Sequence, residues 1–147
     1  MATAYNEVFT LFLSGIQDYK IDNLYLSATP TLADAYMCDF LIKGIPYFDN
    51  CEQDLENRDD TTRTFNITLT TDEKVILSDL MTVQWLTKEV NDIRQMQLHL
   101  SDPKAFKHYA EANNLKEKKD LLGVMQEKAD KLMVRYSNKN INWDDFM

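Results

Sequence analysis

Apolar residues recur along much of the chain at the three- and four-residue spacings that place side chains on one face of a helix. The first such helix is expected between Tyr5 and about Asp18. Its apolar stripe consists of Val8, Phe9, Phe12, Leu13 and Ile16. A stripe of this kind needs an apolar partner surface, so we expect this helix to pack against another element.

A second, more buried helix is predicted over the apolar run from Leu32 to Ile42. Pro30 precedes this run, and proline is favourable in the first turn of a helix. Gly44 and Pro46 are expected to end it. The aromatic residues in and after this run are Tyr36, Phe40, Tyr47 and Phe48. Aromatic side chains dominate both cores and interfaces, so we expect this cluster to pack in the core, with an intersubunit contact as the alternative.

The third helix carries a capping box, because Thr70 is followed three residues later by Glu73. Apolar residues then recur at Val75, Ile76, Leu80, Val83, Trp85, Leu86 and Val90. Since Ile76, Leu77, Leu80, Met81 and Trp85 surround much of the helix, we expect it to be the central helix of the domain. Before it, Phe65, Ile67 and Leu69 alternate, which predicts a short extended segment or a loop held by three apolar side chains. Residues 91–100 either continue the helix or form a separate short one.

A long helix is predicted next, with Asp102 as its cap, Pro103 in its first turn and an end at Arg135 or Tyr136. Unbroken, it would span about 50 Å at about 1.5 Å per residue, with Asn113-Asn114 as the possible kink. A coiled-coil-like seam is formed by Leu115, Leu122, Ala129 and Tyr136, interleaved with Met125 and Leu132. Lys118 interrupts this seam.

These elements, with only three Gly and three Pro in 147 residues, predict an all-α protein. We expect a small helical bundle with a long C-terminal helix and an extended C-terminal tail. The domain boundaries are residues 1–137 for the bundle and 138–147 for the tail. The tail has lost helical periodicity but carries Ile141, Trp143 and Phe146, which are costly to leave exposed. We therefore expect the tail to be mobile in a free subunit and ordered in an assembly.

The charge pattern argues against two functions, tight binding of nucleic acid and binding of calcium. The formal net charge is −8, which opposes tight binding to a phosphate backbone. Residues 49–60 hold six carboxylates against one arginine. This stretch has no glycine, so it does not fit a calcium-binding loop, and a solvated face is the expected role.

No recognisable catalytic or metal-binding motif occurs. Cys38 and Cys51 form neither a CxxC pair nor a disulfide framework, and His99 and His108 do not have the spacing of helical metal ligands. We expect no enzymatic activity, no catalytic residue, no cofactor and no metal. No basic leader and no run of 18 apolar residues are found, so we expect a soluble protein with no membrane association.

Nine short segments form a recognisable pattern: Cys51–Leu55, Arg58–Asp60, Phe65-Asn66, Leu69-Thr70, Ile76–Leu86, Leu100–Asp102, Phe106–Tyr109, Ala112–Glu117 and Arg135–Ser137. This pattern resembles the small neck proteins of phages that infect Gram-positive bacteria, the head–tail connector (adaptor) proteins of tailed bacteriophages. The resemblance covers most of residues 5–137 and rests on packing and capping residues.

The resemblance implies a structural virion protein that forms a homo-oligomeric ring, commonly twelvefold, under the portal vertex. Such a ring bridges the portal protein to the stopper or tail-completion protein and lets DNA pass through its lumen during ejection, without binding it tightly. The subunit would be assembled in the host cytoplasm and reside in the neck of the virion. The alternative is a non-virion helical module with a regulatory or assembly-chaperone role.

Two groups of residues are candidates for these roles. Contacts with the portal or a neighbouring subunit are expected from Ile141, Trp143 and Phe146. An acidic lumen or surface is expected from Glu52, Asp54, Glu56, Asp59 and Asp60, because like-charge repulsion keeps duplex DNA from adhering to a channel wall.

Overall fold

The computed structural model of the protein describes residues 2–16, 31–99 and 105–140. Its main elements are the helices α1 (Tyr5–Gly15), α3 (Thr31–Gly44), α4 (Thr71–His99) and α5 (Ala105–Asn140). A short 3₁₀ helix, η1 (Ile45–Tyr47), follows α3 directly, and three two-residue strands complete the described part of the chain. The all-α prediction with a long C-terminal helix is confirmed.

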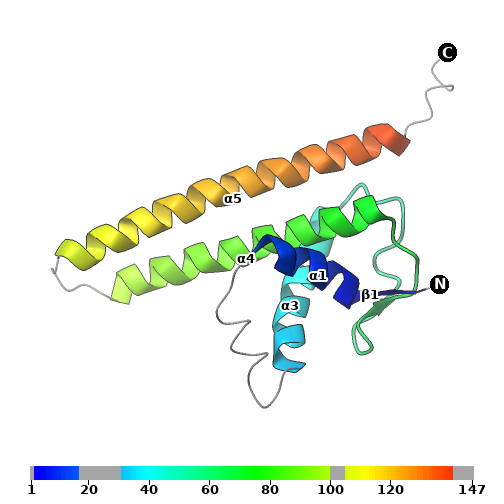
Figure 1. The fold of residues 1–147 in the computed structure, drawn as a ribbon, viewed down its shortest axis with the longest axis horizontal. Helices are drawn as coiled ribbons and strands as arrows, with labels where there is room; N and C mark the ends of the chain where they lie inside the picture. Colours follow the sequence, from blue (N-terminus) through cyan, green and yellow to red (C-terminus); the bar gives the residue numbers. More distant parts are fainter. Residues whose placement is uncertain (1, 17–30, 100–104, 141–147) are drawn as a thin grey trace.

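Helix α4 is the central element, as the sequence predicts. It contacts α5 on one side and α1 and α3 on the other (Figure 1). The residues Ile76, Leu77, Leu80, Met81 and Leu86 are all buried. The helix continues to His99, so residues 91–99 extend it and do not form a separate helix.

The start of α4 is fixed by the predicted capping box. The Glu73 amide donates to the Thr70 hydroxyl at 3.3 Å, and the Thr70 amide donates to the Glu73 carboxylate at 2.7 Å. These two bonds satisfy amide groups that have no partner within the helix.

Helix α1 packs across α4 through its predicted stripe. Val8, Phe9 and Phe12 are buried, while Leu13 and Ile16 are half-buried against the same core. The helix ends at Gly15, earlier than the expected Asp18, because Ile16 has an extended backbone with φ −132° and ψ 161°.

Helix α3 runs two residues past the predicted end and leads into η1, whose second residue is Pro46. Gly44 suits the close approach of the two helices, because a Cβ at this position would lie 3.2 Å from Cβ and 3.3 Å from the carbonyl carbon of Leu80 in α4. Core packing of the aromatic cluster is confirmed for Phe40 and Phe48, which are buried. It is wrong for Tyr47, whose exposed fraction is 60% because η1 turns it away from the core.

The segment from Thr64 to Leu69 begins as a strand and continues as a loop. Strand β3 (Thr64–Phe65) lies between β1 (Thr3–Ala4) and β2 (Arg58–Asp59), antiparallel to both. The register pairs Thr3 and Arg58 with Phe65. The Thr3 hydroxyl donates to the Ile67 carbonyl and accepts from the Leu69 amide, both at 3.0 Å. These contacts attach the N-terminal segment to the loop before α4.

Helix α5 covers α4 along the predicted seam. Ala129 and Tyr136 are buried, and Leu122, Met125 and Leu132 are half-buried against the core. Lys118, which interrupts the seam, places its ammonium group 2.8 Å from the Glu89 carboxylate and over the Trp85 ring. The helix passes through residues 113 and 114 without a break and ends at Asn140. Residues 138–140 are therefore helical and do not belong to an extended tail.

Candidate assembly surface

A buried carboxylate joins three separate segments of the fold. Glu73 is 1% exposed, and beyond its cap to Thr70 it accepts hydrogen bonds from Gln53 Nε2 at 2.8 Å and from the Tyr136 hydroxyl at 3.0 Å. The Cys51 thiol lies 3.3 Å from its Oε2 atom. These bonds hold the loop after η1 and the end of α5 against the first turn of α4.

The environment of Glu73 favours its charged form. Burial alone would raise the pKa of this carboxyl, but the Thr70 amide and the donors from Gln53, Cys51 and Tyr136 outweigh burial, and the pKa lies below its ordinary value. The pKa of the Cys51 thiol is raised to about 11, first by burial and then by the neighbouring carboxylate. Cys51 is therefore protonated at neutral pH and acts as a donor in a structural network.

The five acidic candidates, Glu52, Asp54, Glu56, Asp59 and Asp60, are all exposed. Several of them also shape the loop that carries them. Asp59 accepts from the amides of Thr61 and Thr62, and Asp60 accepts from the Tyr5 hydroxyl at 2.5 Å and from Arg58 Nε at 3.1 Å. Hydrogen bonds from Tyr5, together with Arg58, keep the pKa of Asp60 below its ordinary value. The structure thus adds a local role that the charge pattern did not reveal.

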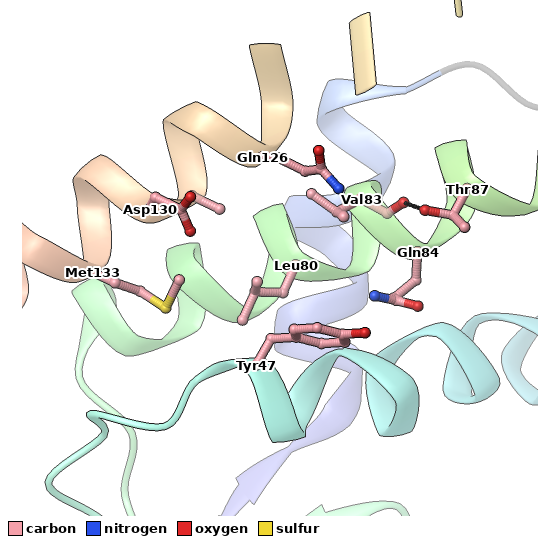
Figure 2. A pocket seen from close by; sticks show the side chains of 9 residues that line it. Tyr47, Leu80, Val83, Gln84, Thr87, Gln126, Asp130 and Met133 are labelled. Atoms are coloured by element: carbon pink, nitrogen blue, oxygen red, sulfur yellow. Dashed lines mark hydrogen bonds between the residues drawn. The ribbon is translucent and has the colours of Figure 1, made fainter. Parts of the chain in front are cut away.

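The pair of helices α4 and α5 has two recessed flanks. On one flank a groove of about 400 Å³ is bordered by Tyr47, Leu80, Val83, Gln126 and Asp130 (Figure 2). On the other flank a cavity of about 290 Å³ lies between α1, α4 and α5. It is lined by apolar side chains together with Ser78, Asp79, Thr82 and Lys128.

The face of α5 that points away from α4 is also partly apolar. Val124 and Val134 are 59% and 60% exposed, and Leu121, at the mouth of the second cavity, is 47% exposed. They alternate with charged side chains such as Lys131, which pairs with Glu127 at 3.0 Å. Single exposed apolar residues are common on proteins, but these lie along one helix that has α4 as its main packing partner.

The tail candidates Ile141, Trp143 and Phe146 lie outside the described residues, so their contacts stay predictions. Sequence reasoning did not single out Asp79 or Lys128, although a carboxylate beside the apolar residues Leu77, Leu80 and Met81 is a usable signal. The sequence pattern predicts a core position for Tyr47, but its place directly after Pro46, where the helix ends, is a signal against this prediction. Among the described residues no group of three or more His, Cys, Asp or Glu side chains is placed to hold a metal ion.

The comparisons with known proteins identified no relative of this chain. No family model matches the chain, and no curated protein and no solved structure matches it. None of the helices in the described part of the chain is both long enough and apolar enough to cross a bilayer.

Proposed function

We propose that this protein is a head–tail connector subunit of a tailed bacteriophage, which forms a homo-oligomeric ring between the portal protein and a stopper or tail-completion protein. The resemblance of its packing and capping segments to phage neck proteins motivates the proposal. The observation that carries it is the α4–α5 pair, which leaves two opposite flanks and one helix face open for contacts. A ring subunit needs two different contact surfaces, one for each neighbour.

The charge distribution supports passage of DNA through such a ring. Exposed carboxylates gather in the loop between η1 and α4, at Glu52, Asp54, Glu56, Asp59 and Asp60. In the proposed ring this loop borders the lumen, where negative charge prevents the duplex from adhering. Ring symmetry multiplies this charge by the number of subunits, and we expect twelve by resemblance.

Coexpression with the portal protein of the same phage tests the proposal. The expected result is a portal-bound complex whose electron micrographs show an added ring below the portal, and a protein that is also present in purified mature virions. A subunit that never joins portal-containing particles would contradict the proposal. A subunit that binds assembly intermediates but is absent from mature virions would support the assembly-chaperone alternative.

A further inference from the structure

Tyr47 is an exposed aromatic side chain at a fixed position. It ends η1, directly after Pro46, and Figure 2 shows its ring beside Leu80 and Gln84 at the edge of the groove. Its exposed fraction of 60% leaves most of the ring accessible. Its hydroxyl makes no hydrogen bond with the described part of the chain. An exposed tyrosine with an unused donor is the kind of residue that anchors protein interfaces.

The cavity on the opposite flank has the size and lining for one such side chain. Its volume of about 290 Å³ is just below the range for small-molecule sites, which begins at about 300 Å³, so it suits a single side chain. The apolar wall is formed by Leu11, Ile16, Trp85, Leu86, Leu121 and Met125. An aromatic ring inserted here would contact apolar groups on three helices.

One polar group of this cavity lacks a full set of partners. Asp79 is 7% exposed, and its Oδ1 atom lies 3.5 Å from the Lys128 ammonium group, whereas its buried Oδ2 atom accepts no hydrogen bond from the residues that the structure describes. The neighbouring hydroxyls cannot serve it as they stand, because Ser78 donates to the Val75 carbonyl and Thr82 donates to the Ser78 carbonyl. The χ2 angle of an aspartate has broad, shallow energy minima. Rotation of the Asp79 carboxylate about χ2 can therefore turn Oδ2 toward an incoming donor.

The two flanks also carry opposite charges and lie on opposite sides of the subunit. Asp130 borders the groove beside Tyr47, while Lys128 stands at the mouth of the cavity with a side chain that is 56% exposed. The two residues are two positions apart on α5, so at about 100° per residue they project to nearly opposite sides of the helix. Two different, complementary surfaces on opposite sides of a subunit generate a head-to-tail interface, which closes into a ring when the rotation permits.

We infer that Tyr47 of one copy inserts into the Asp79 cavity of a second copy, where its hydroxyl donates to the Asp79 carboxylate while Asp130 of the first copy approaches Lys128 of the second. This contact deepens the proposed function, on which it rests, by naming the surface that joins neighbouring subunits.

A mixing experiment tests the head-to-tail geometry. Tyr47→Ser removes the inserted ring, and Leu121→Glu places a negative charge at the cavity mouth on a side chain that is exposed, so neither change should disturb the fold. Circular dichroism melting serves as the check of folding. Mass photometry with and without portal protein should show that the wild type assembles and that each variant alone does not. The Tyr47→Ser variant keeps an intact cavity, and the Leu121→Glu variant keeps an intact Tyr47. An equimolar mixture of the two should therefore form heterodimers, which cannot grow further because neither of the two remaining surfaces is functional.

The proposed hydrogen bond has its own test. Tyr47→Phe and Asp79→Asn should each weaken association by about 10- to 100-fold, the usual loss for a bond to a charged group, and the double variant should be no weaker than either single one. Additive losses would overturn the bond. Normal assembly by Tyr47→Ser or Leu121→Glu alone, or a mixture that stays monomeric, would overturn the interface while leaving portal binding intact. Heterodimers of a protein that never binds portal would support the interface and reject the proposed function.

Discussion

The hydroxyl of Tyr136 lies 3.0 Å from Oε2 of Glu73, so the last turns of α5 are hydrogen-bonded to the first turn of α4. The same hydroxyl accepts the Glu52 amide at 3.0 Å. One phenol therefore joins α5, α4 and the acidic loop, at a point where the carboxylate is buried and cannot turn to water.

Tyr136→Phe should lower the free energy of unfolding by about 2 kcal/mol, because it leaves a buried carboxylate and a backbone amide each short of a partner. Urea unfolding followed by circular dichroism measures this loss. Tyr47→Phe is the matched control, since that hydroxyl is exposed and the change should stay within about 0.5 kcal/mol. Equal effects of the two substitutions would show that the buried network does not stabilise the fold.

Glu73 should make the fold sensitive to acid. Because its pKa in the folded protein is below the ordinary value of 4.5, the unfolded chain binds the proton more readily, and the stabilisation is present above that value and lost as the pH falls through the folded pKa. Glu73→Gln should be less stable at pH 7 but lose less stability between neutral pH and about pH 4. Urea midpoints across this range provide the measurement.

Asp79 supplies a control of opposite sign. Burial raises the pKa of this carboxyl, with Lys128 partly offsetting the effect, so the folded state binds the proton more readily and gains stability as the pH falls. Asp79→Asn removes that gain and should steepen the acid loss relative to the wild type. A shallower profile would contradict the assigned direction of the shift.

Two glycines should respond oppositely to alanine. Gly44→Ala places a Cβ against the backbone and side chain of Leu80 and should cost about 1–3 kcal/mol. Gly123→Ala lies inside α5, where the new Cβ would meet no side chain or other element of the described chain within 4 Å, so it should stabilise by about 0.5–1 kcal/mol through helix propensity. Thermal melts of both variants decide the matter, and a neutral Gly44→Ala would indicate that α3 and α4 can separate at little cost.

Deletion of the tail should separate folding from assembly. Lys139 pairs with Asp72 at 3.0 Å between exposed side chains, so removing residues 138–147 loses one weak ion pair and the final turn of α5. We expect a soluble helical protein with nearly unchanged melting but weaker attachment to portal or to its neighbour. Deleting only residues 141–147 is the sharper variant, because it leaves the described helix complete. Unchanged portal capture by both truncated forms would reject the role assigned to Ile141, Trp143 and Phe146.

The features that the sequence predicts correctly are those that depend on a local residue pattern. The capping box of Thr70 and Glu73 and the apolar periodicity of α1 and α4 were readable because both follow directly from helix geometry. The further bonds of Glu73 were not, since its partners Gln53 and Tyr136 come from segments far away in the chain. The end of α5 was placed too early because Ser137 to Asn140 lack apolar periodicity, although the Asn50 side chain bonds to Ser137 and to the Met133 carbonyl there.

The candidate site was harder to foresee for a related reason. The five acidic residues could be named from charge alone, but the cavity beside Asp79 exists only once α1, α4 and α5 pack together. The turn after a helix determines whether a tyrosine that follows it faces the core or the solvent. For Tyr47 this turn is η1, which leaves the side chain exposed.

The pairing of β1 with β3 sets an order of events during synthesis. The Tyr5 amide donates to the Arg63 carbonyl, and the apolar face of α1 finds its main partner in α4. At about 5–20 residues per second, α1 leaves the ribosome on the order of 10 s before that partner does. Helices α4 and α5 are neighbours in sequence and can associate as soon as both have emerged. The first helix made thus waits longest for its main partner, and its phenylalanines are accessible to a chaperone in the interval.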